Sequence, residues 1–339
     1  MKSIDVHAHC VVEAVEALVR DDPRLQEQRQ DEAQRDSPQS RAESARMVRE
    51  SLPSLTTLEQ RLADMDAAGV EAQVVSPSPS QYHYWADEEL ALRIVRTANR
   101  GVADLVAAAP ERLAGLGLVA LQHPATLAES LEDALALGLA GVEISSHAPG
   151  VELSDSRLEP FWARAAETGA VVFLHPFGCS LGARLALQYL SNSVGQPVEH
   201  AVALSHLIFS GVLDRHPGLR VLAAHGGGYL PHHIGRADHA WRVRPDARGC
   251  AEPPSEYLRR LWFDSLVHSP EELGALVRKV GADRVLLGSD HPFDMGTPGP
   301  LAALDAAGLA AGERDAIAAG NAEKLGLWPT RRLSGKERP

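Results

Sequence analysis

Cysteine is scarce in this sequence, and its spacing excludes two kinds of site. The 339 residues include three cysteines, Cys10, Cys179 and Cys250, and no two of them form a CxxC pair. Disulfide frameworks and structural zinc knuckles both depend on several cysteines at regular spacings. The sequence therefore predicts neither, and its cysteine usage fits a reducing compartment.

Long apolar runs and an excess of positive charge are also missing. No stretch approaches the roughly 18 apolar residues of a membrane-spanning helix, and the first residues lack the basic and then apolar pattern of a secretion signal. The formal charge is −12 at pH 7, so we expect no basic surface for nucleic acid or anionic lipid. We predict a cytoplasmic protein that binds neither nucleic acid nor membrane.

Short runs rich in β-branched residues and leucine alternate with longer segments of helical spacing. This alternation is typical of parallel βαβ units, whose strands are covered on both faces. The GxGxxG fingerprint of a doubly wound sheet is absent after the first run, which favours a closed barrel. The sequence thus predicts an α/β fold, a (β/α)8 TIM-type barrel. Its strands are predicted at Ile4–His9, Glu71–Ser76, Leu113–Leu121, Gly141–Ser145, Val171–His175, Val221–His225, Leu261–Asp264 and Val285–Ser289.

The segments between the strands define the predicted helices and an insertion. Asp21–Ser54 is rich in Gln, Arg, Glu and Asp, which predicts a helical or loop insertion at about residues 12–55, over the barrel mouth. We expect a single metal-dependent barrel domain at 1–329 and a flexible tail at 330–339. Helices are predicted at Leu58–Ala68, Glu88–Ala109, Pro124–Leu137, Arg157–Thr168, Val198–Arg215 and Pro270–Val280.

Polar residues with metal-binding chemistry stand at the ends of several predicted strands. Side chains alternate along a strand, so His7 and His9 point to the same side. His175, His225 and Asp290 stand at the ends of the fifth, sixth and eighth runs. Barrel enzymes carry their catalytic residues on this face, and imidazole suits Zn²⁺ and similar ions. A single strand-end histidine is more often structural, but the complete set predicts one shared metal site.

Seven segments carry a resemblance to a known family: Ile4–His9, Arg61–Val70, His175–Pro176, Ala224–Gly228, Gly235–Arg236, Pro253–Tyr257 and Leu287–Phe293. The chain resembles the amidohydrolase superfamily, in the branch typified by 2-amino-3-carboxymuconate-6-semialdehyde decarboxylase. The resemblance covers nearly the whole chain and implies a metal-dependent enzyme on a barrel.

The resemblance implies a role for each residue of the metal site. A single divalent ion would be bound by His7, His9, His175 and Asp290, with a water completing its shell. His225 would stand beside that water as the acid and base, and Asp290 could also shuttle a proton. Zn²⁺ is the ion expected for a site of three histidines and one aspartate, with Mn²⁺ as the alternative.

The resemblance also implies how a carboxylate substrate is held. Arg236, reaching across a homodimer interface, and Arg49 would clamp substrate carboxylates, because a guanidinium suits a carboxylate bidentately. For Arg49 a solvated position in a polar insertion is an equal alternative. The aromatic ring expected near the substrate is Tyr189, where the typical decarboxylase has tryptophan, and His291 replaces a usual tyrosine.

Two reactions remain open at this stage. The first is nonoxidative decarboxylation of an unsaturated or aromatic carboxylic acid, a small-molecule substrate. The second is hydrolysis of an amide, lactone or carbon–carbon bond at the same metal. A non-catalytic barrel would require a site that holds no metal. Cys10 and Cys179 are interpreted as structural, and His83 as either a packing residue or a residue of the pocket.

Overall fold

The computed structural model describes residues 2–34 and 36–328, and the predicted barrel order is confirmed within them. The parallel strands form two sheets, ordered β1-β2-β3 and β11-β10-β9-β8-β5-β4. β3 and β4 are two pieces of one run separated by Leu116, so eight strand positions follow one another in chain order, as a (β/α)8 barrel requires. The strands are β1 (Ile4–Cys10), β2 (Ala72–Pro77), β3 (Leu113–Gly115), β4 (Gly117–Leu118), β5 (Gly141–Ile144), β8 (Val171–Leu174), β9 (Arg220–Ala223), β10 (Trp262–Asp264) and β11 (Val285–Leu286), with a separate antiparallel pair β6 (His147–Ala148) and β7 (Val151–Glu152).

Individual hydrogen bonds, rather than a continuous ladder, join the first and last strand positions. The backbone N–H of Val6 donates to the carbonyl of Leu287, and the N–H of Asp290 donates to the carbonyl of His7, each at 2.8 Å. A parallel bridge also pairs Ala8 with His291. These contacts place the end of β1 beside the segment that follows β11.

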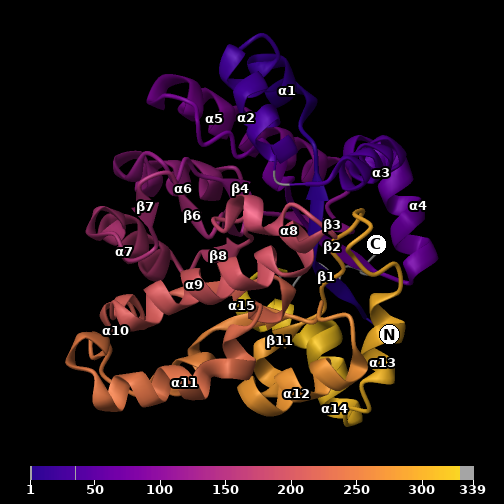
Figure 1. The fold of residues 1–339 in the computed structure, drawn as a ribbon. Helices are drawn as coiled ribbons and strands as arrows, with labels where there is room; N and C mark the ends of the chain where they lie inside the picture. The colour runs from indigo at the N-terminus through magenta and orange to yellow at the C-terminus, as the bar shows by residue number, and fades with distance from the viewer. Residues whose placement is uncertain (1, 35, 329–339) are drawn as a thin grey trace.

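Helices surround the sheets (Figure 1). The predicted helices at Leu58–Ala68 and Pro270–Val280 match α4 and α12 residue for residue. The segment predicted as one helix from 198 to 215 is divided, because Gly211 adopts a φ of +73° between α9 and α10. The helices are α1 (Glu13–Val19), α2 (Pro23–Gln34), α3 (Pro38–Thr56), α4 (Leu58–Ala68), α5 (Glu88–Ala108), α6 (Leu127–Ala136), α7 (Glu159–Thr168), α8 (Leu190–Ser193), α9 (Gly195–Phe209), α10 (Val212–Arg215), α11 (Leu230–Val243), α12 (Pro270–Val280), α13 (Pro300–Ala306), α14 (Ala311–Asp315) and α15 (Asn321–Leu325).

The predicted insertion is helical and is anchored at its start. Val15 and Val19 of α1 and Leu25 of α2 are buried in one cluster with Ile94 and Ala98 of α5. α3 starts at the N-cap Ser37, whose side chain accepts the N–H of Ser40. α1 and α2 lie above the sheets in Figure 1, with α3 beside them. The single-domain limits at 1–329 stay a prediction, and the predicted tail at 330–339 lies outside the described residues.

The barrel interior is apolar away from the mouth. Val6, Phe173, Leu222 and Leu286 come from four different strands and form one buried cluster with Trp328, which follows α15. Burial of apolar area at about 25 cal/mol per Å² stabilises this end. Because apolar side chains fill this part of the barrel, an interior site for a ligand is expected at the carboxyl ends of the strands.

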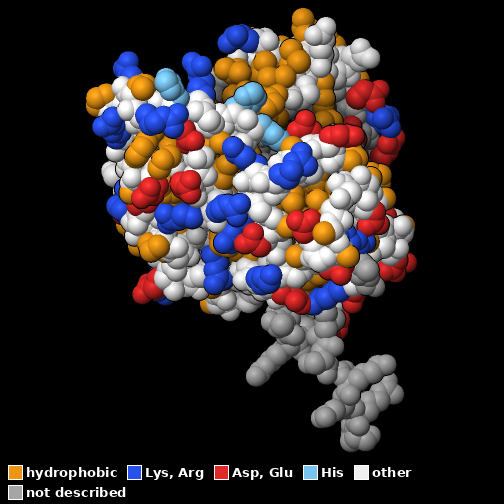
Figure 2. Space-filling view, turned by 90° about the horizontal axis from the view of Figure 1, so that it is seen from below, with side chains coloured by type: hydrophobic (Ala, Val, Ile, Leu, Met, Phe, Trp, Pro, Cys, Tyr) orange, Lys and Arg blue, Asp and Glu red, His pale blue; other side chains and the backbone are white. Residues whose placement is uncertain are grey.

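The outer surface mixes charges of both signs. On the face shown in Figure 2, Lys and Arg side chains are interspersed with Asp, Glu and hydrophobic ones. None of the helices in the described part of the chain is long and apolar enough to span a bilayer.

Candidate metal centre and substrate cavity

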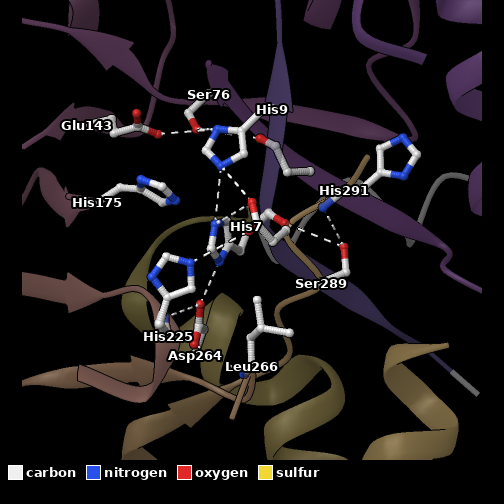
Figure 3. A network of polar contacts seen from close by, with 12 residues as sticks. His7, His9, Ser76, Glu143, His175, His225, Asp264, Leu266, Ser289 and His291 are labelled. Atoms are coloured by element: carbon white, nitrogen blue, oxygen red, sulfur yellow. Dashed lines mark hydrogen bonds and ion pairs between the residues drawn. The ribbon is translucent and has the colours of Figure 1, made fainter. Parts of the chain in front are cut away.

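Four imidazoles converge at the barrel mouth (Figure 3), and the carboxylate of Asp290 lies 3.2 to 3.6 Å from nitrogens of three of them. His7 and His9 belong to β1, while His175, His225 and Asp290 follow β8, β9 and β11. The ring centroid of His7 lies 5.1 Å from that of His9, 5.0 Å from that of His175 and 5.2 Å from that of His225. The structure thus brings together all five residues singled out in the sequence.

More donor atoms converge than one four-coordinate ion would use. One ligand atom from each of His7, His175, His225 and Asp290 lies within 4.8 Å of all the others. His9 lies outside this group but is close to two of its members, because its Nε2 lies 3.2 Å from Nε2 of His7 and 3.2 Å from Oδ1 of Asp290. Geometry alone therefore leaves open whether His9 or His225 completes a ligand set.

Irregular backbone conformations orient these side chains toward one another. The register between β1 and β2 shifts between Asp5 and Ala8, the kind of bulge that redirects side chains. His225 and Asp290 have φ values of +52° and +60°, which non-glycine residues rarely adopt. Such conformations concentrate at functional sites, where the surrounding contacts hold them in place.

Asp264 at the end of β10 orients this centre, and the sequence analysis did not assign it a role. Its Oδ2 lies 2.6 Å from Nδ1 of His7, so Nε2 of His7 faces the cluster. The same carboxylate accepts the backbone N–H groups of His225 at 3.0 Å and Gly226 at 2.8 Å. A hydrogen-bonded carboxylate on the outer nitrogen is a common support for a metal-binding histidine. Its position as the last residue of the predicted strand Leu261–Asp264 is the signal that could have revealed it.

A similar arrangement supports His9. The hydroxyl of Ser76 lies 3.3 Å from Nδ1 of His9, and Oε2 of Glu143 lies 3.7 Å from the same nitrogen. Glu143 is fully buried, and its other oxygen accepts the hydroxyl of Tyr82 at 2.6 Å. Both histidines of β1 therefore turn Nε2 toward the centre. Glu143 and Tyr82 also went unassigned in the sequence analysis.

The electrostatics fit a bound cation. Burial raises the pKa of Asp290, but His7, His225 and His9 outweigh it and hold that pKa well below its usual range, so the carboxylate is ionised. Burial, together with His9, His225 and His7, lowers the pKa of His175 well below its ordinary value. Both ring nitrogens of His175 are buried, and neither has a hydrogen-bond partner within residues 2–34 and 36–328. An ionised carboxylate and a neutral imidazole with a free lone pair are the forms that bind a metal.

The pKa of His7 also indicates that the centre favours a positive charge. Burial lowers the pKa of His7, but the carboxylates of Asp290 and Asp264 outweigh it and raise that pKa to about 10. The centre therefore favours a positive charge between these carboxylates. A divalent cation supplies such a charge and displaces the proton.

The centre opens into a cavity of about 420 Å³, which fits a small ligand. His175, His225 and Asp290 line its base. Its walls include residues of the insertion and of the segments after β8 and β11, among them Glu32, Asp36, Met47, Val48, Phe177, Tyr189, Phe293 and Asp294. In the described part of the chain, no arginine or lysine lines this cavity.

The three predicted substrate-binding residues have different positions. Tyr189 is half-buried in the cavity wall. Burial and the nearby carboxylates of Asp294, Asp36 and Asp290 raise the pKa of Tyr189 to about 12. Arg236 on α11 and Arg49 on α3 are exposed and do not line the cavity of their own chain.

The structure also shows the positions of four residues for which no firm functional role was predicted. Cys10 is buried, and burial raises the pKa of its thiol to about 11, which fits a structural role. Cys179 is buried and lines the cavity. His83 is buried beside a neighbouring cavity, with its ring against Trp85. His291 points away from the cluster in Figure 3, and burial lowers its pKa to about 4.

The chain is similar to known proteins along most of its length. A family model described as amidohydrolase matches residues 4–325. The chain is 37% identical over 246 residues to the 2-amino-3-carboxymuconate-6-semialdehyde decarboxylase of Dictyostelium discoideum, covering 71% of this chain and 68% of that protein. Among solved structures, 5-carboxyvanillate decarboxylase from Sphingomonas paucimobilis has a TM-score of 0.81 and 26% identity, covering 96% of this chain and 98% of that chain.

A further solved structure shares the fold and contains a metal. It is a dihydroxybenzoic acid decarboxylase from Polaromonas sp. JS666 with bound manganese and the inhibitor 2-nitroresorcinol. Its TM-score is 0.78 at 22% identity, covering 96% of both chains. The named relatives confirm the predicted enzyme class, a decarboxylase or carboxy-lyase. The chain belongs to the amidohydrolase family.

Proposed function

We propose that this enzyme is a metal-dependent, nonoxidative decarboxylase of an unsaturated or aromatic carboxylic acid. The observation that carries the proposal is the buried cluster of histidines with Asp290 at the base of a cavity of about 420 Å³. The relatives named above act on muconate-type and hydroxylated aromatic acids, which supports the same substrate class. No observation of the site favours the alternative reaction, hydrolysis.

We assign the metal ligands to His7, His9, His175 and Asp290. Their donor types suit one divalent ion, and Zn²⁺ and Mn²⁺ both accept such ligands. The manganese in the Polaromonas enzyme supports Mn²⁺, whereas the three histidines support Zn²⁺. When bound, the ion acts as a Lewis acid that orients and polarises the substrate's oxygen atoms.

His225 is the proposed proton donor. Its Nε2 lies 3.6 Å from Oδ2 of Asp290, and its side chain is 17% exposed at the cavity base. It delivers a proton to the carbon that bears the carboxylate, so a C–H bond forms. The C–C bond to the carboxylate then breaks, CO2 leaves, and the electron pair returns to the ring or the conjugated chain. The balance is one carboxylate and one proton in, and one decarboxylated product and CO2 out.

Arg236 is proposed to bind the substrate from a second subunit of a homodimer. Its guanidinium is exposed on α11, and the cavity of its own chain is lined by carboxylates without a compensating arginine or lysine in the described residues. Arg236→Ala should raise KM without changing metal content. Mixing this variant with a His225→Asn variant should restore activity in mixed dimers, and a complete lack of rescue would refute the shared site.

Arg49 and Tyr189 complete the proposed binding set. Arg49 follows Val48, a lining residue, whereas Tyr189 lines the cavity itself. Arg49→Ala and Arg46→Ala form a matched pair, because both arginines are exposed on α3. A KM increase specific to Arg49→Ala supports its role, and equal kinetics would assign Arg49 to the solvated surface.

The deciding experiment combines metal analysis with a CO2 assay. Wild type and Asp290→Ala should be measured by elemental analysis and tested against hydroxybenzoic, aminobenzoic and muconate-type acids. We expect near-stoichiometric metal and CO2 release in wild type, with both lost in the variant. Product that contains solvent oxygen without CO2 release would instead support hydrolysis. Wild type that holds no metal after reconstitution would overturn the proposal.

A further inference from the structure

A second histidine contacts the proposed proton donor from outside the cavity. His200 lies on α9, and its Nε2 is 3.0 Å from Nδ1 of His225. The two ring centroids are 5.3 Å apart at an angle of 72°. His200 is fully buried. This leaves Nε2 of His225 as the nitrogen that faces Asp290 and the cavity.

The glycine turn after His225 holds this pair together. Gly228 has a φ of +61°, and a Cβ there would collide with the carbonyl oxygen of Pro197 and lie 2.9 Å from Cβ of His200. The turn can therefore approach α9 this closely only with glycine. This close approach of the two backbone segments brings His225 next to His200, where their ring nitrogens come within 3.0 Å.

The contact selects the tautomer of His225. A neutral imidazole carries one N–H, so one ring nitrogen donates and the other accepts. If His200 donates from Nε2, Nδ1 of His225 accepts, and the proton of His225 is on Nε2, toward the cavity. If His225 donates from Nδ1, its Nε2 is a bare lone pair and becomes available as a metal ligand.

The surroundings of His200 favour the first arrangement. Its Nδ1 is buried and has no hydrogen-bond partner among the described residues. In the second arrangement this nitrogen would carry the proton of neutral His200, and buried N–H groups without an acceptor are rare. Burial also lowers the pKa of His200 well below its ordinary value, which keeps the ring neutral. The single proton of His200 is therefore best placed on Nε2, in the hydrogen bond.

We propose that His200 is a positioning residue that holds His225 with its proton on Nε2. In this form His225 presents a proton to the substrate carbon and has no lone pair on Nε2 for the ion, so the set of five donors reduces to the four proposed ligands. This inference rests on the role of His225 proposed above. Its test includes a measurement that does not depend on turnover.

The tautomer can be read directly by NMR. Zinc-loaded protein labelled with 15N-histidine should show a His225 signal, identified by its loss in His225→Asn, with Nδ1 unprotonated and Nε2 protonated. His200→Leu should abolish this preference. Protonation of Nδ1 in wild type, or an unchanged signal in His200→Leu, would overturn the proposal. If wild type releases no CO2, the proposed function fails while this measurement still reports the tautomer.

Kinetics provide the second test. His200→Leu should lower kcat by about 10- to 100-fold, the usual effect of removing such a partner, with KM and metal content unchanged. His200→Gln should recover much of the loss, because the glutamine amide group can occupy the place of Nε2. In a His225→Asn background, His200→Leu should cause no further loss. An additional loss there, or an equal loss in His200→Gln, would assign His200 to packing alone.

A matched control comes from the same helix. His206 on α9 is partly exposed and contacts Ser154 and Glu152 away from the centre. His206→Leu should leave kcat and the His225 signal unchanged. If His200→Leu proves unstable to heat, His200→Gln and the wild-type tautomer decide the question. Equal losses in the His200 and His206 variants would contradict the specific role of His200.

Discussion

The metal centre and the cavity wall are built in opposite ways. His7, His9 and Asp264 are fully buried, and each side chain has a polar partner on another strand position. Met47 and Val48 of the insertion are partly or largely exposed and line the cavity through apolar contact. From this difference we expect the strand ends to determine the reaction and the insertion to determine which substrate fits. Substitutions should separate these two contributions.

The largest effect is expected from the ligands. His175→Ala and Asp290→Ala should lose the metal and reduce kcat/KM by more than about 10³-fold, because several kcal/mol of Lewis-acid stabilisation disappear. Elemental analysis beside the CO2 assay checks both effects. Full metal occupancy in either variant would show that the ligand assignment is wrong.

His225→Asn should separate chemistry from metal binding. We expect metal content to remain near that of wild type, while kcat falls by about 10²- to 10⁴-fold, the usual contribution of a general acid. The comparison with His175→Ala in one metal analysis is decisive. Equal loss of metal in the two variants would make His225 a ligand instead.

Asp264→Asn should weaken the centre without abolishing it. The amide keeps one oxygen to accept hydrogen bonds, but it no longer supplies the charge that orients His7. Metal affinity or activity should fall by about 10- to 100-fold, measured by competition with a chelator. An unchanged affinity would mean that backbone geometry alone orients His7.

Met47→Ala should alter the wall alone. Removing one apolar group from the cavity wall weakens the free energy of substrate binding by about 1 to 3 kcal/mol at most. We therefore expect KM to rise by about 10-fold with kcat preserved. Steady-state kinetics on two acids of different size test this, and the smaller acid should suffer less. A fall in kcat with constant KM would place Met47 in the chemistry.

Tyr189→Phe should produce the smallest change. Since burial and nearby carboxylates raise the pKa of Tyr189 to about 12, the phenol stays protonated up to about pH 10. The variant should therefore keep the shape of the pH profile, with KM raised about 2- to 10-fold for one lost hydrogen bond. An alkaline limb that disappears in Tyr189→Phe would show that the phenol ionises during turnover.

Much of the fold could be read from local patterns. α4 ends where Gly69 adopts a φ of +69°, and α12 starts where the side chain of Ser269 accepts the N–H of Glu272. Both signals are local, so the predicted bounds match. The division at Gly211 was missed, because a glycine alone does not show whether its helix continues. The run at 113–121 was predicted too long, since pairing with neighbouring strands sets where it ends.

The sequence by itself determined the barrel order and the candidate residues, because strand alternation and strand-end position are properties of neighbouring residues. Only the tertiary structure decided how those candidates are oriented. Asp264 reaches His7 across 257 positions in the chain, and His200 reaches His225 across 25. The same folding leaves Arg236 and Arg49 outside the cavity of their own chain. Such contacts depend on the packing of elements that are distant in sequence, and no local pattern encodes the tautomer or the direction of a ring.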